Sequence, residues 1–214
     1  MQPKPSKATA GRVERQTVTE TKRHPDAPTR RYHPALVALH WLLALLLVLA
    51  LGMGTFVLKE MPNDAIDKIG ALRGHMLIGI AIGALMLVRL IVRWRTSLPP
   101  AASAGHPLLD RLRSLAHTGL YVLVFAMAAS GAATALLAGL PEIVFGGAVL
   151  PLPETFAAYA PRAIHGWIAT ALFVVIGFHL IGALFHQFRL KDRLLSRMWF
   201  GSGASVQHNP RRTP

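Results

Sequence analysis

Apolar residues gather into four long stretches that are separated by polar segments. The stretches cover residues 35–57, 74–94, about 115–137 and 164–188. Each approaches or exceeds the roughly 18 to 20 apolar residues that an α-helix needs to cross the hydrocarbon of a bilayer. The pattern therefore predicts an all-α fold, an integral membrane four-helix bundle, with both termini on one side of the membrane.

Composition agrees with a chain whose solvent is lipid. Hydrophobic residues make up 52% of the 214 residues, and the mean hydropathy is +0.40, which points away from a soluble globule. The first apolar stretch follows more than 30 polar residues and has no clear cleavage site, so we interpret it as a retained helix. We expect a membrane domain over residues 32–200, flanked by disordered tails at 1–31 and 201–214.

The basic residues are distributed unevenly, and their distribution predicts the orientation. Of the 23 Lys and Arg residues, eight precede the first apolar stretch, five lie from the end of the second to the start of the third, and six follow the fourth. Cytoplasmic segments carry such an excess, so we expect a bacterial inner-membrane protein with both termini cytoplasmic. This bias accounts for the net charge of +13 without nucleic acid, for which the tails also lack aromatic stacking residues.

The sequence contains no cysteine. This excludes a disulfide, a thiolate-held iron–sulfur cluster and covalent attachment of a c-type haem. Any haem must therefore be held without a covalent bond to the protein.

Four histidines in or at the mouths of the apolar stretches form two expected pairs. His165 and His179 are 14 residues apart, which on a helix means about 320° of rotation and a rise of roughly 21 Å. They share a face but cannot share one metal ion, so each needs a partner on another helix. The first and second apolar stretches supply His40 and His75, which lie at opposite depths in the membrane if adjacent helices run antiparallel. We predict two stacked haems, the inner one between His40 and His179 and the outer one between His75 and His165.

Glycines fall near the same helix faces. Gly79 and Gly83 follow His75 by four and eight residues, and Gly54 follows His40 by 14. Positions without side chains leave room for a flat macrocycle. Gly79 and Gly83 also form a G-x-x-x-G pattern, which is typical of close helix packing, and the sequence does not separate the two interpretations.

Several polar residues are candidates for contacts with haem or quinone. Arg89 follows His75 by 14 residues, whereas Arg73 and Arg162 precede the outer histidines by two and three. Each could pair with a haem propionate, or its charge could lie in solvent at the membrane interface. His186, seven residues after His179, could donate to a quinone carbonyl or be solvated. We interpret His117 as interfacial rather than as a fifth ligand.

These residues give the chain a family resemblance over roughly residues 31–200. The motifs are Arg31-Tyr32 followed by His40-Trp41, then Arg-Gly-His75 with Val-Arg89-Leu, then His165 and His179, and finally Lys191-Asp192. In this order and spacing the chain resembles the bacterial cytochrome b561 proteins.

The resemblance implies a four-helix membrane protein with two b haems, ligated by the positions that match His40 with His179 and His75 with His165. Members of the family conduct electrons between the periplasmic side and the quinone pool. One well-studied type oxidises superoxide and reduces ubiquinone. The expected partners are membrane lipid, ubiquinone or another quinone, and a periplasmic or membrane redox protein.

The outer loops show no net attraction for an anion such as superoxide. They hold four basic and five acidic residues, so overall steering is not expected, although Lys68, Arg73 and Arg162 could guide an anion locally. Two other functions stay open. The chain could be a membrane subunit that docks a separate dehydrogenase such as a hydrogenase, or a haem-free proton or metal transporter. The histidine spacing disfavours the transporter, because a metal site needs ligands clustered around one ion.

Overall fold

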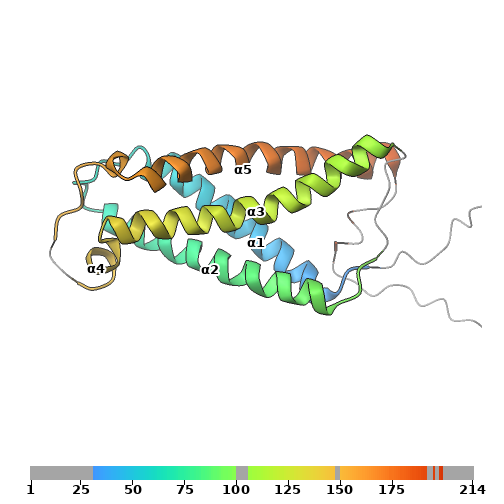
Figure 1. Cartoon of the computed structure of the whole chain (residues 1–214), viewed down its shortest axis with the longest axis horizontal. Helices are drawn as coiled ribbons and strands as arrows, with labels where there is room; N and C mark the ends of the chain where they lie inside the picture. Colours follow the sequence, from blue (N-terminus) through green and yellow to red (C-terminus); the bar gives the residue numbers. More distant parts are fainter. Residues whose placement is uncertain (1–30, 100–105, 148–149, 192–194, 196–197, 200–214) are drawn as a thin grey trace, which may run out of the picture.

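The computed structural model describes residues 31–99, 106–147, 150–191, 195 and 198–199. The described residues form helices and contain no strand, which confirms the all-α prediction. Four long helices dominate (Figure 1): α1 (Pro34–Gly52), α2 (Lys68–Arg95), α3 (Pro107–Leu137) and α5 (Ala160–Phe185). The disorder predicted for the two tails falls on residues 1–30 and 201–214, outside the described residues.

Local sequence explains where the helices begin. Two His-Pro pairs, His33-Pro34 and His106-Pro107, open α1 and α3. In each pair the histidine side chain accepts a hydrogen bond from a backbone amide of the first turn, at 3.2 and 3.3 Å. Proline at the first helical position has no amide hydrogen that would need a partner. These two histidines therefore cap helices.

Two helices end in π-helical turns. α1 continues into η1 (Met53–Leu58), and α5 continues into η3 (His186–Leu190). With these turns included, four helical segments of 25 to 31 residues are long and apolar enough to cross a membrane. They are longer than the sequence predicted, since α2 starts at Lys68 and α3 at Pro107. The chain is a multi-pass membrane protein of four helices.

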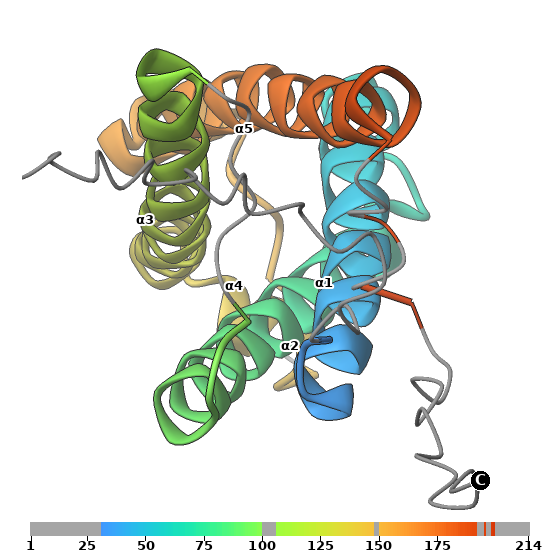
Figure 2. The same ribbon diagram turned by 90° about the vertical axis from the view of Figure 1, so that its right-hand side faces the viewer.

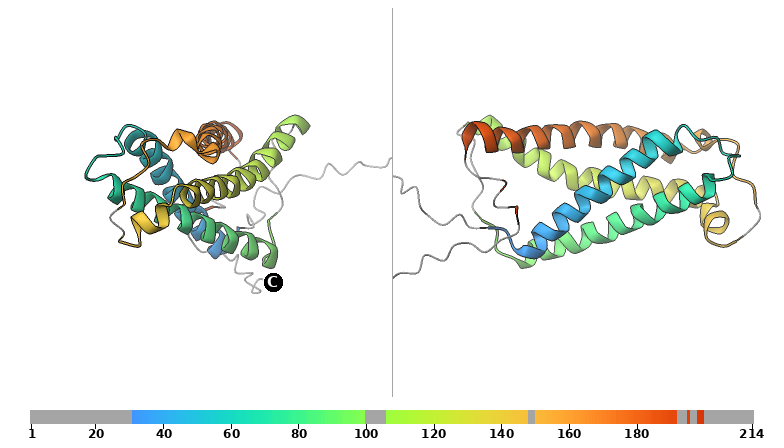
Figure 3. Two further views of the ribbon diagram at one scale, coloured as in Figure 1. Left: turned by 60° about the vertical axis from the view of Figure 1, so that its left-hand side comes forward. Right: turned by 180° about the vertical axis from the view of Figure 1, so that it is seen from behind.

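The long helices surround a common axis. Viewed along it in Figure 2, their order is α1, α2, α3 and α5, and Figure 3 gives the side views. α3 packs most closely along α5, α1 packs against α2, and α2 packs against α3. Among the described residues, α5 makes hardly any close backbone contact with α1 or α2. The backbone of α5 therefore lies farther from the α1–α2 pair than from α3, and side chains of the central apolar cluster, such as Leu172, pack between them.

Two apolar clusters stabilise the bundle. The central cluster contains Leu172 of α5, which is fully buried, and Val124 of α3. The second cluster lies at the far end, where the short helix α4 (Leu140–Val144) covers the start of α2 and the end of α3. Gly139 opens α4 in the left-handed region with φ 65°, a conformation that glycine adopts at no steric cost.

Basic side chains hold the loops at the α4 end of the bundle through hydrogen bonds. Lys68 is buried and donates from Nζ to the carbonyl oxygens of Leu58 and Met61, at 2.7 and 2.5 Å. Arg73 donates from Nε and Nη2 to the carbonyl oxygen of Val144, at 2.9 and 2.7 Å. Both side chains thus donate hydrogen bonds to backbone carbonyl oxygens that would otherwise lack partners.

Candidate functional site

The four predicted histidines meet in two pairs. The ring centres of His40 on α1 and His179 on α5 are 6.3 Å apart, and those of His75 on α2 and His165 on α5 are 6.2 Å apart. The first pair lies toward the end where α1 begins and the second toward the opposite end, because α5 runs antiparallel to α1. We call them the inner pair and the outer pair.

The distances within the pairs fit one iron between two imidazoles. An imidazole nitrogen lies about 2.0 Å from a first-row metal, and the ring centre lies roughly 1.1 Å farther, so two axial rings have centres about 6.2 Å apart. Both pairs match this value. The described residues contain no group of three or more His, Asp or Glu side chains that could hold a bare metal ion. The porphyrin ring of haem supplies the remaining ligands of the iron itself. A site with two histidines is therefore suited to haem rather than to a bare metal ion.

The backbone also fits a flat group between the paired rings. Helices in direct contact have axes 8–10 Å apart, yet the backbone of α5 makes hardly any close approach to that of α1 or α2 over the described residues, and α5 meets these helices through side chains. The pairs connect these separated helices. Two imidazoles that face each other from separated helices would hold a flat group such as haem between them, so the residues present fit haem.

The hydrogen-bond partners of His165 favour one tautomer of its ring. Its Nδ1 lies 3.1 Å from Ser130 Oγ and 3.2 Å from the carbonyl oxygen of Met127. The Ser130 hydroxyl donates its own proton to the Met127 oxygen at 3.0 Å, which leaves it only lone pairs for the imidazole. Both neighbours of Nδ1 are therefore acceptors. Nδ1 carries the proton, and Nε2 carries the lone pair that a metal requires.

His75 differs from His165. Its Nδ1 is buried and has no hydrogen-bond partner among the described residues. Gly54, in the π-helical turn after α1, lies against the same ring, because a Cβ there would come within 3.4 Å of His75 Cε1. Gly131 of α3 lies against His165 more closely, since its Cβ would come within 3.0 Å of Cε1. Glycines on two helices therefore let the backbone approach both outer imidazoles.

The structure distinguishes the two roles predicted for the glycines, room beside a haem ligand and close helix packing. Gly54 lies beside an imidazole, as expected of a haem-facing position. Gly83 faces Ala128 of α3 at 3.7 Å, which is ordinary helix packing, whereas a Cβ on Gly79 would meet nothing within 4 Å. The G-x-x-x-G pattern thus serves α2–α3 packing at one of its two positions.

The inner pair has a third histidine beside it. The ring of His117 on α3 lies 5.4 Å from that of His179. It therefore faces the bundle interior, rather than only the interface that the sequence suggested. The charge of Arg89 also acts on His40 and His179. Its Nη1 donates to the carbonyl oxygen of Leu36 at 3.0 Å, and its guanidinium lies 6.0 Å from the ring centre of Tyr121.

The outer arginines have different surroundings. The guanidinium of Arg73 is held on the carbonyl oxygen of Val144, so in this structure it anchors α4. Arg162 lies over Gly166, with Nη1 3.4 Å from the position of a Cβ there, and its charge acts on both His75 and His165. Of the two, Arg162 is the one whose charge acts on the outer pair. Their predicted contact with a propionate stays a prediction.

His186 and Trp41 lie near the inner end. His186 is buried in the π-helical turn after α5, with its ring 6.4 Å from that of Phe185. The indole of Trp41 donates from Nε1 to the carbonyl oxygen of Met198 at 2.7 Å and meets Trp199 edge to face. The segment after η3 therefore contacts α1 next to His40. The predicted contact of His186 with a quinone stays a prediction.

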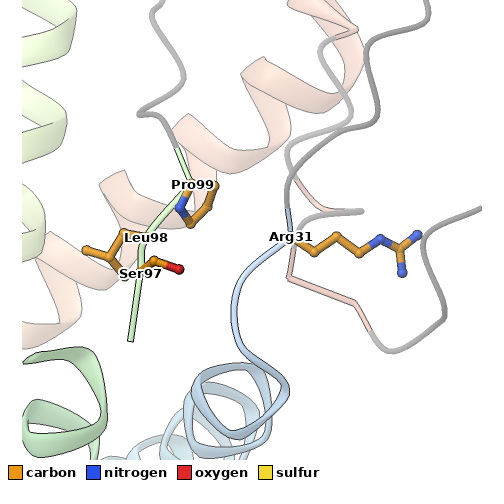
Figure 4. A pocket seen from close by; sticks show the side chains of 4 residues that line it. All are labelled: Arg31, Ser97, Leu98 and Pro99. Carbon is orange, nitrogen blue, oxygen red and sulfur yellow. The ribbon is translucent and has the colours of Figure 1, made fainter. Parts of the chain in front are cut away.

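A surface pocket lies away from both pairs. Figure 4 shows its lining, which comes from the start of α1 and the chain after α2: Arg31, Ser97, Leu98 and Pro99. The cavity measures about 270 Å³, and Arg31 points away from the other three residues. An adjoining cavity of about 520 Å³ adds Arg95 to the lining. The hollow belongs to the inner end of the bundle and contains none of the paired histidines.

Sequence reasoning missed the contribution of α3. Ser130, Met127, Gly131 and His117 all lie beside the paired imidazoles. His117 and Gly131 are 14 residues apart, the same interval that separates His165 and His179, so one face of α3 reaches both pairs. The repeated 14-residue interval is the feature of the sequence that could have predicted this role of α3.

Comparison with known proteins identifies the family of the chain. A profile described as prokaryotic cytochrome b561 matches residues 31–201. The chain is 29% identical to the probable superoxide oxidase CybB of Yersinia pestis over 79% of this chain and 96% of that protein. It is 30% identical to cytochrome b561 homolog 2 of Escherichia coli K12, over 78% and 90%, and 29% identical to cytochrome b562 of Cereibacter sphaeroides, over 76% and 90%. The chain therefore belongs to the prokaryotic cytochrome b561 family.

Proposed function

We propose that this membrane-spanning b-type cytochrome binds two haems and carries single electrons across the bacterial inner membrane. The electrons would pass between a donor on the periplasmic side and the quinone pool. One observation carries the proposal: two histidine pairs, each with the spacing of two axial imidazoles, are separated by 14 residues along α5.

In this proposal, His40 and His179 hold the inner haem, and His75 and His165 hold the outer haem. Haem, when bound, supplies one-electron exchange between Fe(III) and Fe(II). Two histidine ligands for each haem would favour electron transfer over oxygen activation. The protein orients the rings: Nδ1 of His165 is held by Ser130 and Met127, and Arg89 places a positive charge near the inner imidazoles.

We propose the orientation from the basic residues. Arg31, Arg93 and Arg95 lie at the end of the bundle where α1 begins and α2 ends. Positive residues mark the cytoplasmic side, so the inner pair faces the cytoplasm, and His186 at that end is the residue we propose to contact a quinone. Labelling of single cysteines introduced at Ser97 and at Glu154 with a membrane-impermeant reagent tests this. Only Glu154→Cys should react in intact cells from outside.

For the donor we propose superoxide as the first candidate, because the Yersinia relative is named a probable superoxide oxidase. Arg162 is the basic residue that fits local guidance of an anion to the outer pair. Lys68 and Arg73 donate to backbone carbonyls. An Arg162→Gln variant should reduce superoxide-dependent haem reduction while a neutral artificial donor keeps its rate.

The experiment that tests the proposal is a reduced-minus-oxidised absorption spectrum of the detergent-purified chain, with haem-to-protein stoichiometry. Wild type should contain two b haems, and His40→Ala and His75→Ala should each retain one, with different spectra. A single haem in wild type would overturn the two-site assignment. Absence of haem would overturn the cytochrome assignment and favour the transporter. Stoichiometric co-purification of a dehydrogenase, with no activity of the isolated chain, would instead support a docking subunit.

A further inference from the structure

We infer that Ser130 is a positioning residue for the outer haem, and that its hydrogen bond to His165 lowers the reduction potential of that haem. This inference rests on the proposed function, because it assigns Ser130 a role toward a haem held by His75 and His165. The effect of Ser130 would favour the passage of an electron from the outer site to the inner site.

The first step is the direction of the hydrogen bond. Ser130 Oγ donates its proton to the Met127 carbonyl oxygen at 3.0 Å and lies 3.1 Å from His165 Nδ1. With its proton committed, the oxygen can only accept from the imidazole. His165 therefore donates from Nδ1 to Ser130 Oγ, with the Met127 carbonyl oxygen as a second, slightly more distant acceptor at 3.2 Å, and its Nε2 keeps the lone pair that a metal requires.

The second step is the rigidity of the acceptor. Ser130 is buried, and its own carbonyl oxygen accepts a hydrogen bond from the hydroxyl of Thr134 at 2.8 Å. Gly131 brings the α3 backbone so close to His165 that a Cβ there would stand 3.0 Å from Cε1. The imidazole therefore has little freedom to rotate away from Ser130.

The third step is the effect on a metal. An imidazole that donates its second N–H becomes a more basic ligand, and such partners tune the metal site. A more basic ligand stabilises Fe(III) relative to Fe(II), which lowers the reduction potential of the iron it binds. Ser130 thereby makes the outer iron easier to oxidise.

The fourth step is the asymmetry between the sites. Of the four paired histidines, His165 is the one whose ring nitrogen has a hydrogen-bond partner within the described residues, and the buried Nδ1 of His75 has none. One arginine acts on each pair, Arg89 on the inner imidazoles and Arg162 on the outer ones, so nearby positive charge does not distinguish the two sites. Within the described residues, the hydrogen bond to Ser130 does distinguish them. A haem held by His75 and His165 would therefore give up its electron more readily, and Ser130 would favour transfer from the outer site to the inner site.

The test is a potentiometric titration of the detergent-purified holoprotein, followed by optical absorption and by low-temperature electron paramagnetic resonance. Ser130→Ala should raise the midpoint potential of the outer haem and leave the inner one unchanged. The equilibrium constant for electron exchange between the haems should change by up to about tenfold, which is about 59 mV for a one-electron couple. The ferric resonance signal of the outer haem should also shift, because an imidazole that loses this hydrogen bond is a less basic ligand and changes the ligand field.

Two variants serve as controls. Thr134→Val removes a buried hydroxyl one turn away that contacts the Ser130 carbonyl rather than the imidazole, so both potentials should stay at the wild-type values. Ser130→Thr keeps an acceptor oxygen and should restore the wild-type potential of the outer haem. A His40→Ala background, which holds the outer haem alone, gives the same comparison without overlap from the inner haem.

The outcomes separate the inference from the proposed function. Two haems in Ser130→Ala with unchanged potentials and an unchanged resonance signal would overturn the inference and leave the dihaem assignment standing. An equal shift in Thr134→Val would also overturn it, since the effect would then come from general loosening of α3. A wild-type protein without two haems would overturn the proposed function itself.

Discussion

The outer pair and the inner pair have nearly the same ring spacing but different surroundings. At the outer pair, glycines on two helices approach the imidazoles and a hydroxyl and a carbonyl hold His165. At the inner pair, a third histidine and an arginine lie beside the rings. An arginine charge acts on each pair, so what distinguishes the two sites is the hydrogen bonding and close packing around the outer rings and the third ring beside the inner ones. Under the proposed function, haems held by the two pairs would differ in potential through these surroundings rather than through their ligands.

The largest effect should come from removing a ligand on α5. His165→Ala and His179→Ala take one histidine from each pair, so each variant should lose about half of the bound haem and keep the other site. Haem content by the pyridine haemochrome method measures this. If either variant loses both haems, the two sites do not assemble independently, and the comparison between them fails.

A smaller effect should follow from filling the space beside the outer rings. In Gly131→Ala the new methyl carbon would stand 3.0 Å from His165 Cε1, whereas in Gly54→Ala it would stand 3.4 Å from His75 Cε1. The first contact forces the ring to move by a few tenths of an ångström, and the second is close to ordinary packing. Gly131→Ala should therefore lower outer haem occupancy and thermal stability more than Gly54→Ala. Equal losses would show that the outer site is less rigid than its packing indicates.

Substitution of Arg89 should change a reduction potential without loss of haem. Arg89→Leu removes the charge that acts on the inner imidazoles, so the midpoint potential of the inner haem should fall while the outer one is unchanged. Arg89→Lys keeps the charge and should retain most of the wild-type value. Redox titration resolves the two haems. A fall of the outer potential in Arg89→Leu would contradict the assignment of this arginine to the inner pair.

The smallest effect is expected at His117. Although its ring lies 5.4 Å from that of His179, His40 already completes the inner pair. His117→Phe should therefore keep two haems per chain, with a minor change in the spectrum of the inner one. Loss of the inner haem in this variant, together with retention of that haem in His40→Ala, would make His117 the ligand in place of His40.

Much of the fold could be predicted from the sequence because the bilayer imposes a length on each helix. Apolar runs located all four long helices, and the 14-residue interval between His165 and His179 predicted the two depths at which histidines now meet. Helix ends were less predictable. The polar residues from Pro107 onward continue α3, since a helix extends beyond the hydrocarbon wherever its first turn is capped.

The second sphere could not be predicted in the same way. The bond between Ser130 and His165 joins residues 35 apart on helices whose rotation is set by packing, and hydropathy carries no information about rotation. Likewise, Arg73 meets the carbonyl of Val144 because α4 folds back over α2, and a five-residue helix leaves little signal in the sequence. Ligand types follow from residue identity, whereas their supporting contacts depend on tertiary geometry.

The separation of the two pairs along α5 has an electrical consequence. Leu172, fully buried in the central apolar cluster, lies midway between His165 and His179, which are roughly 21 Å apart along the helix. That distance is about two thirds of a 30 Å hydrocarbon layer. With the inner side negative, each 100 mV of membrane voltage would oppose an inward electron by about 1.5 kcal/mol, or roughly tenfold in equilibrium constant. Electron flow through the proposed haems would therefore be electrogenic, and an energised cell would slow it.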